Sequence, residues 1–321
     1  MSVIEISGLR KHFGRTQALD GVQLSVEPGE VYGFIGPNGA GKSTTIRALL
    51  GIIKADEGTA RIFGRDCWRD AVEIHRRVAY VPGDVNLWPN LSGGEVIDLF
   101  LRLRGVRADR RSSIDRGSRS ASAGSAAPAA SGNAASAPSL DELIQRFDFD
   151  PSKKCGSYSK GNRQKVALIA AFASAADLYI LDEPTSGLDP LMEQVFRQCV
   201  VQAKQRGATV FLSSHILSEV EQLCDRIAVV RAGRIIDSGS LDELRHLTRN
   251  KVAVRSAAPL DGLAALKGVH DLHRDGDATT FSLDNSETAP ILAWLADKQP
   301  VHLTSTPPTL EELFMGHYAG H

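Results

Sequence analysis

Eight residues near the start of the chain have the types and spacing of a loop that holds phosphate groups. Gly36-Pro-Asn-Gly-Ala-Gly-Lys-Ser43 follows the apolar run Val31–Ile35, typical of a buried strand, and leads into residues 43–50, which have a helical pattern. Glycines let backbone N–H groups surround phosphates at a helix amino terminus, lysine adds a positive charge, and serine offers a hydroxyl to Mg²⁺. We predict that these residues bind nucleotide phosphates: Gly36, Pro37, Asn38, Gly39, Ala40, Gly41, Lys42, Ser43 and Thr44.

A second group of residues supplies the acids that phosphate hydrolysis needs. The apolar residues 178–181 end in two adjacent carboxylates, Asp182 and Glu183. From the end of a strand, Asp182 would face Mg²⁺ at the phosphate loop, with Ser43 as a second ligand, and Glu183 would polarise an attacking water molecule. The alternative is a strand that simply ends in solvated acids. The run Pro-Thr-Ser-Gly-Leu-Asp that follows favours the catalytic interpretation.

These groups require a framework of buried strands and helices, and the sequence predicts one. From residue 3 to about 104, and from 140 to about 247, short apolar runs alternate with helical patterns, which is typical of an α/β domain. Between residues 105 and 139 the composition changes to Ser, Ala, Gly, Arg and Pro, which predicts a disordered insertion. Its basic front half is either a solvated linker, which the composition favours, or a contact for anionic lipid headgroups.

Taken in order, the motifs resemble those of ABC-type ATPases, from residue 3 to about 245 apart from the insertion. The resemblance implies a P-loop NTPase fold, an α/β nucleotide-binding domain with a helical subdomain. In that family a signature sequence that grips the γ-phosphate lies a little over twenty residues before the metal-binding aspartate. Ser159 precedes Asp182 by 23 residues, so the stretch Tyr-Ser-Lys-Gly-Asn takes this place. The expected nucleotide contacts there are Ser159, Lys160, Gly161 and Asn162, of which Lys160 and Asn162 depart from the common Gly and Gln.

A second stretch, Leu91-Ser-Gly-Gly-Glu95, looks more like the common signature but has a different explanation. Its serine, Ser92, lies 90 residues before Asp182. Ser92 and Glu95 have the spacing of a capping box at the start of a helix, just before the mainly apolar residues 96–100. Such a box stabilises a helix by about 1 kcal/mol and has no part in catalysis. We predict that this stretch is structural.

The resemblance assigns roles to further residues. His215, at the end of the predicted strand Thr209–Ser214, matches the switch histidine that contacts the γ-phosphate; a structural histidine is the alternative. Asp189 matches a loop residue that contacts the opposite subunit. Phe13 holds the place of an aromatic that stacks on adenine, although a core position would also suit it. Gly83 replaces the glutamine that contacts Mg²⁺ in the family, and Asp84 is the candidate oxygen ligand in its place.

The expected ligands and partners follow from the same resemblance. ATP and Mg²⁺ are the expected substrate and metal. The family's signature closes on the nucleotide of an opposite subunit, and this chain has one set of motifs, so we expect a dimer of two copies or of related chains.

Composition limits the other partners. The formal net charge of −1 gives no support to nucleic-acid binding. Four scattered cysteines suggest free thiols, and neither a secretion signal nor an apolar run long enough to span a membrane is evident. We therefore expect a peripheral protein on the cytoplasmic face of the cell membrane, held there by a permease.

The last part of the chain has a different rhythm. We expect domains at 1–248, the nucleotide-binding domain, and 249–321, a small α+β accessory domain with a split β-α-β-β-α-β order. Its strands and helices are predicted from the runs VAVR, LDGLAAL, HDLHR, TTFSL, ILAWLA and VHLTS, and residues 306–318 are predicted to form an amphipathic tail helix.

A single cassette with a short tail domain resembles the stand-alone ATPases of drug and antibiotic exporters, including polyether-type systems. The resemblance implies ATP hydrolysis that powers export through a separate permease, which forms the path of the substrate. The alternatives are an importer ATPase and a soluble ABC protein that acts on ribosomes or DNA, although the latter types carry two cassettes or long coiled coils. A GTPase lacks support because no Asn-Lys-x-Asp guanine motif accompanies the loop.

Overall fold

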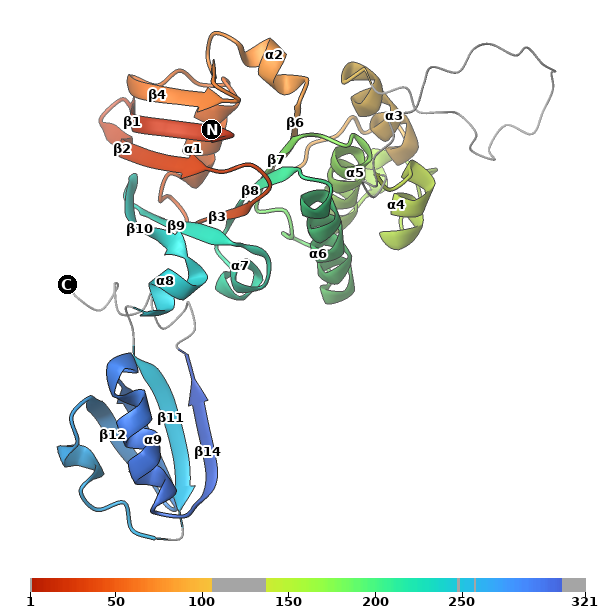
Figure 1. Ribbon diagram of the computed structural model, residues 1–321. Helices are drawn as coiled ribbons and strands as arrows, with labels where there is room; N and C mark the ends of the chain where they lie inside the picture. Colours follow the sequence, from red (N-terminus) through yellow and green to blue (C-terminus); the bar gives the residue numbers. More distant parts are fainter. Residues whose placement is uncertain (1, 106–136, 247–248, 257, 308–321) are drawn as a thin grey trace. The chain divides into compact units, whose positions relative to one another are not determined.

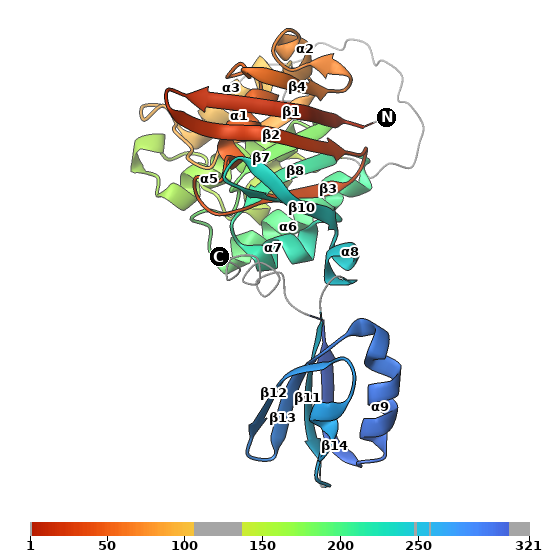
Figure 2. The same ribbon diagram turned by 90° about the vertical axis from the view of Figure 1, so that its left-hand side faces the viewer.

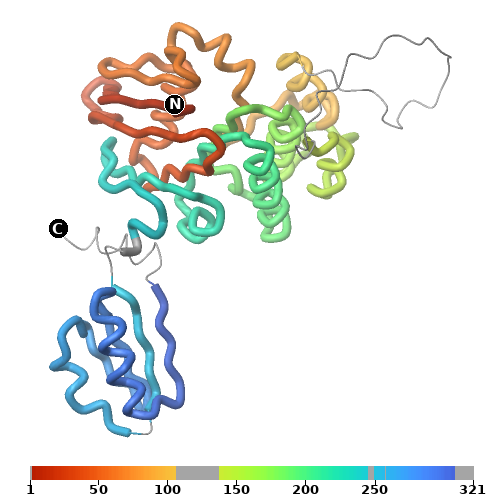
Figure 3. The backbone as a smooth tube through the Cα atoms, in the orientation of Figure 1, coloured from red at the N-terminus to blue at the C-terminus, as the bar shows by residue number. Residues whose placement is uncertain are grey.

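The computed structural model describes residues 2–105, 137–246, 249–256 and 258–307. The chain divides into two compact units, Met1–Asp237 and Ser238–His321 (Figures 1 and 3). Whether the functional domains divide after residue 248 remains a prediction. Most of the predicted insertion and of the predicted tail helix lies outside the described residues.

A central six-stranded sheet organises the first unit. Strands β6 to β9 and β3 run parallel, and β3, β7 and β8 are buried along their whole length. Because parallel strands end at the same edge, the residues after β3, β7 and β8 meet there, the usual ligand site of such sheets. The strand order is β10 (Arg234–Ser240), β9 (Arg226–Arg231), β3 (Val31–Ile35), β8 (Thr209–Ser214), β7 (Leu178–Asp182) and β6 (Val78–Val81).

Helices cover both faces of this sheet. Figures 1 and 2 place α1 (Lys42–Leu49) and α7 (Leu217–Leu223) on opposite sides of it, and α6 (Pro190–Gln205) packs on β8. The predicted helical subdomain is a group of three helices, α3 (Gly93–Leu103), α4 (Leu140–Arg146) and α5 (Lys160–Ala173), in which α5 contacts both of the others. Helix α5 begins at Lys160, within the predicted signature.

A second, antiparallel sheet forms the amino-terminal part of this unit. Its strand order is β2 (Thr16–Val26), β1 (Ile4–Phe13), β4 (Glu57–Ile62) and β5 (Arg65–Asp66), followed by the short helix α2 (Ala71–His75). The expected alternation of strands and helices is wrong here, because β1 and β2 form a hairpin through Gly14, whose φ of 57° suits a tight turn. Helix α1 contacts strands of both sheets and so joins them into one core.

The second unit has the predicted order of strands. Helix α8 (Leu241–His246) precedes β11 (Asn250–Ser256), β12 (Val269–Asp275), β13 (Ala278–Leu283), α9 (Thr288–Ala296) and β14 (Pro300–Thr306). These strands pair antiparallel in the order β12-β13-β11-β14, and the core lies between the sheet and α9. The predicted helix in LDGLAAL is wrong. Gly262, with a φ of 93°, interrupts it, and only a 3₁₀ turn, Leu263–Ala265, forms. A second such turn, Asn285–Glu287, precedes α9.

Among the described residues, every helix is too short or too polar to cross a membrane.

Candidate nucleotide site

The phosphate loop joins the buried strand β3 to helix α1, as predicted. Pro37, Asn38 and Gly39 form its exposed crest, and Ser43 and Thr44 lie half-buried in the first turn of α1. Glycine is required at both ends of the loop. Gly41 has a φ of 110°, and a Cβ on Gly36 would lie 2.2 Å from the carbonyl oxygen of Val230.

Lys42 is the buried cation of the loop. Its side chain is 5% exposed, and Nζ donates to the carbonyl oxygens of Gly36, at 2.7 Å, and Pro37, at 3.2 Å. Burial lowers the pKa of this ammonium group, and the nearby carboxylates of Glu183 and Asp182 act against that shift. The loop therefore holds a desolvated positive charge, which an anionic ligand would stabilise strongly.

The two acids end strand β7 and differ in their surroundings. Asp182 is 7% exposed, and its carboxylate accepts a hydrogen bond from the hydroxyl of Ser213 on β8. Burial, and next the charge of Asp182, raise the pKa of Tyr80 to about 12. Glu183 has a φ of 47°, which is rare for a residue with a side chain and costs about 1–3 kcal/mol. Strain of this kind concentrates at functional sites, because the surrounding structure must hold it.

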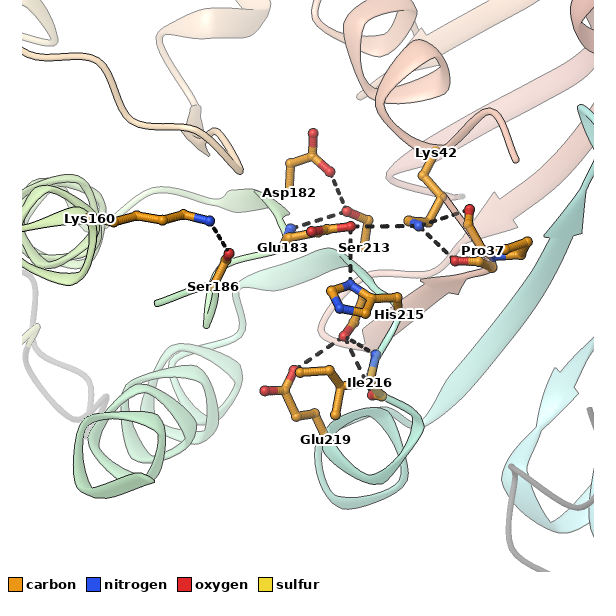
Figure 4. Close-up of polar contacts among 12 residues, drawn as sticks. Pro37, Lys42, Lys160, Asp182, Glu183, Ser186, Ser213, His215, Ile216 and Glu219 are labelled. Carbon is orange, nitrogen blue, oxygen red and sulfur yellow. Dashed lines mark hydrogen bonds and ion pairs between the residues drawn. The ribbon is translucent and has the colours of Figure 1, made fainter. Parts of the chain in front are cut away.

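Glu183 is the centre of a triad of ionisable side chains. Its Oε1 lies 3.3 Å from Nδ1 of His215 and 3.7 Å from Nζ of Lys42 (Figure 4). Its backbone N–H donates to the carbonyl oxygen of Ser213, which fixes the turn after β7. Three buried strands thus bring together one cation, one carboxylate and one half-exposed imidazole from distant parts of the sequence.

The predicted signature begins helix α5 and packs on the turn that follows Glu183. Ser159 caps α5, because its Oγ accepts from the N–H of Asn162 at 3.3 Å. Lys160 Nζ donates to Ser186 Oγ at 2.6 Å, and a Cβ on Gly161 would lie 2.4 Å from the carbonyl oxygen of Gly187. Figure 4 shows the bonded pair Lys160 and Ser186 on one side of Glu183, and Lys42 on its other side. The signature and the phosphate loop of one chain are therefore separate surfaces.

The structure confirms the capping box at the other stretch. Ser92 Oγ accepts from the N–H of Glu95 at 3.2 Å, and Glu95 accepts from the N–H of Ser92 at 2.6 Å. The N–H groups of Gly93 and Gly94 donate to backbone carbonyls of residues 153 and 151. A Cβ on Gly93 would lie 2.4 Å from the hydroxyl of Tyr158. These glycines permit close packing, and their N–H groups are already used.

The remaining candidates are Phe13, Asp84 beside Gly83, and Asp189. Phe13 is 49% exposed at the end of β1, with Lys11 Nζ 5.6 Å from its ring centre, so it is not a core residue. A Cβ on Gly83 would lie 3.2 Å from the carbonyl oxygen of Asp182, and Asp84 follows it as an exposed residue. Asp189 caps helix α6 by accepting from the N–H of Met192 at 3.0 Å.

Two residues with structural roles at the site were not predicted from the sequence. Ser213 holds Asp182 and the turn of Glu183, and the buried Gln164 donates from Nε2 to the carbonyl oxygen of Pro184 at 3.0 Å. Ser213 could have been found from its position in a buried strand, two residues before His215. A polar side chain in such a strand is expected to have a hydrogen-bond partner.

Fold and site together define a P-loop ATPase cassette. Residues 19–186 match the family model described as ABC transporter. The chain therefore belongs to the ABC transporter family, as one of its ATP-hydrolysing cassettes.

Its relatives include proteins of drug resistance and transport. The chain is 33% identical to the daunorubicin/doxorubicin resistance ATP-binding protein DrrA of Streptomyces peucetius over 311 residues, 94% of this chain and 86% of that protein. It is 29% identical to the bacitracin transport ATP-binding protein BcrA of Bacillus licheniformis, over 88% of this chain and 85% of that protein. Among solved structures, the chain matches the dimeric, post-hydrolysis structure of the ATP-binding cassette MJ0796 bound to ADP and Pi. The TM-score is 0.58 and the identity 21%, over 74% of this chain and 98% of that one, so the two share the same fold.

Proposed function

We propose that this chain is the ATPase subunit of an exporter for drug-like or other lipophilic compounds, acting on a separate membrane permease. The observation that carries the proposal is the convergence of Lys42, Glu183 and His215 at the ends of three parallel strands, with the signature on a separate surface. Export is supported by the names of the relatives, which concern resistance to daunorubicin and the transport of bacitracin.

In the proposed cycle the phosphate loop takes the triphosphate of ATP. Lys42 exchanges the carbonyl oxygens of Gly36 and Pro37, and its ion pair with Glu183, for oxygens of the β- and γ-phosphates. The phosphate charge offsets the desolvation of the ammonium group, so binding should raise the pKa of Lys42 toward its ordinary value. Phe13 stacks on the adenine ring.

The donor set fits Mg²⁺. In the described part of the chain there is no group of three or more His, Cys, Asp or Glu side chains that would form a complete metal cage. Mg²⁺ needs no such cage, because it binds through one or two protein oxygens, phosphate oxygens and water. Ser43 Oγ and the buried carboxylate of Asp182 would hold it, with Asp84 contributing directly or through water, and it would neutralise charge on the phosphates.

Hydrolysis then needs a base beside the γ-phosphate. Once Lys42 turns to the phosphates, the Glu183 carboxylate is released to accept a proton from water as the water oxygen attacks the γ-phosphorus and the bond to ADP breaks. His215, 3.3 Å from that carboxylate, orients it and contacts the γ-phosphate. The strained turn of Glu183 keeps the carboxylate aimed at this point.

The signature of a second cassette completes the site. Ser159 and the N–H groups at the start of α5 grip the γ-phosphate held by the opposite phosphate loop, because helix amino termini bind anions. Lys160 adds a positive charge, and its bond to Ser186 ties the signature to the loop that ends in Asp189, the proposed contact with the opposite subunit. ATP thus closes the dimer, and hydrolysis reopens it.

Co-purification tests the biological assignment. A tagged chain, expressed at its natural level and extracted in mild detergent, should bring down a hydrophobic membrane protein and show ATPase activity in the complex. Vesicles of that complex should transport a lipophilic dye outward only with ATP. Inward transport would assign the chain to an importer, and recovery of ribosomes or DNA in place of a membrane protein would refute the proposal.

A further inference from the structure

The sheet of the second unit has two edges, β12 and β14. The outer backbone groups of an edge strand can pair with another chain, and proteins block such edges with charged side chains, bulges or proline. The two edges of this sheet differ in these respects.

The β12 edge is blocked. Its sequence, VHDLHRD, includes Asp271, Arg274 and Asp275. Its pairing with β13 shifts register between His270 and His273, and Asp271 has a φ of 50°, so the strand is bent as well as charged. A further strand would find neither a regular ladder nor a neutral surface there.

Among the described residues, no strand pairs with the outer edge of β14. Its sequence, PVHLTST, contains no Lys, Arg, Asp or Glu, and its single proline, Pro300, stands at the first position. Its ladder with β11 is regular from Thr306 to His302, with one register shift at the proline end. Both faces of the strand are exposed beyond this first residue. An uncharged, regular edge strand of this length is a good template for pairing.

The apolar core also continues onto β14. Leu303 pairs with Val254, and directly paired residues lie on the same face of a sheet. Val254 is 1% exposed and belongs to the core under α9, whereas Leu303 is 37% exposed and Val301 is 78% exposed. A strand added beside β14 would cover this open margin.

We propose that β14 pairs antiparallel with β14 of a second copy of this chain, about a two-fold axis at or next to Leu303. A second copy suits the edge because two neutral strands bring no like charges together, and Leu303 would meet Leu303 of the partner subunit on the core face. The contact is self-complementary and uses up the open edge of both copies. Only the blocked β12 edges would then face outward, so the assembly ends at two copies and forms no fibre.

This pairing is independent of the proposed cassette dimer, since it involves residues of the second unit alone and needs no nucleotide. A single strand pair is a small contact, so the free affinity should be weak. In an assembly that already holds two copies together, the effective concentration of the second strand rises to about the millimolar range, and weak pairing becomes sufficient.

Cysteine cross-linking of the full chain, without nucleotide, tests the pairing. Paired residues of antiparallel strands have Cα atoms about 4.5–5.5 Å apart, within the range of a disulfide. We expect Leu303→Cys, or one neighbour in a scan of positions 301–305, to give a disulfide-linked dimer on mild oxidation. The native cysteines are all buried and provide a low background. The matched control is His273→Cys on β12, also exposed, which should stay monomeric. A flat profile across the scan, or equal cross-linking of the control, would overturn the proposal.

Sedimentation equilibrium provides the second measurement. Nucleotide-free wild-type chain should form dimers at about 100 μM, and Leu303→Lys should raise the dissociation constant at least about tenfold, because two ammonium groups would face each other. His273→Lys should have no effect. The double variant Leu303→Lys, Glu183→Gln should still dimerise through its cassettes with Mg-ATP. A failure of the β14 pairing would therefore leave the proposed function untouched. If the wild-type chain is monomeric and a chain ending at Pro307 dimerises, the tail covers β14 and the proposal is refuted.

Discussion

Replacing the two capping serines separates the two signature-like stretches. Ser92→Ala and Ser159→Ala remove the same kind of bond, a serine Oγ that accepts from an N–H three residues on, at 3.2 Å and 3.3 Å. In Ser92→Ala the backbone N–H still donates to Glu95, so one bond is lost in each variant. Each change should lower the free energy of unfolding by about 1 kcal/mol. For a unit of this size, that corresponds to a fall in Tm of about 2–4 °C.

The ATPase rates should differ although the stabilities match. Ser92 lies in a helix cap whose neighbouring N–H groups are bonded within the chain, so Ser92→Ala should keep the wild-type rate. Ser159→Ala removes a hydroxyl that, in the proposed closed dimer, donates to the γ-phosphate. A hydrogen bond to a charged group is worth about 1.5–3 kcal/mol, so the rate should fall at least about tenfold.

The assay is thermal unfolding followed by circular dichroism, together with phosphate release at saturating Mg-ATP, on both variants and the wild type. The equal loss of stability makes each variant the control for the other. A fall in rate for Ser92→Ala as large as that for Ser159→Ala, or the reverse ranking, would show that we assigned the phosphate contact to the wrong stretch.

Three further predictions concern the triad, the signature and the thiols. Glu183→Gln should bind Mg-ATP, lose turnover and accumulate as a dimer in sedimentation, and hydrolysis at the wild-type rate would exclude Glu183 as the base. Lys160→Met breaks the bond to Ser186 and should raise the ATP concentration for half-maximal rate about tenfold, whereas Lys160→Arg should restore most of the affinity; equal values for all three proteins would contradict this role. Burial raises the pKa of Cys67 to about 12 and of Cys199 to about 11, so their thiolate fraction at pH 8 is about one in a thousand or less and rises with pH. A thiol reagent should therefore find the four cysteines only after unfolding, and fast labelling of the folded chain would disprove their burial.

Much of the fold follows from local patterns in the sequence. The buried runs β3 and β8 have the predicted bounds, and the capping pair Ser92 and Glu95 forms as expected. The predicted helix at LDGLAAL failed because one glycine at residue 262 adopts a positive φ and leaves room for a single 3₁₀ turn. The hairpin between β1 and β2 was missed although buried and exposed residues partly alternate along both strands, which is typical of antiparallel strands with one covered face.

By itself, the sequence predicted which residues carry the chemistry, because glycine-rich loops, paired acids and capping boxes depend on residues close together in the chain. Only the tertiary structure decided which of them meet. It placed Glu183 between Lys42 and His215, occupied the N–H groups of Gly93 and Gly94, and joined Lys160 to Ser186. It also placed β14 at a sheet edge. Strand order and close packing between distant segments set these contacts, and no local pattern specifies either.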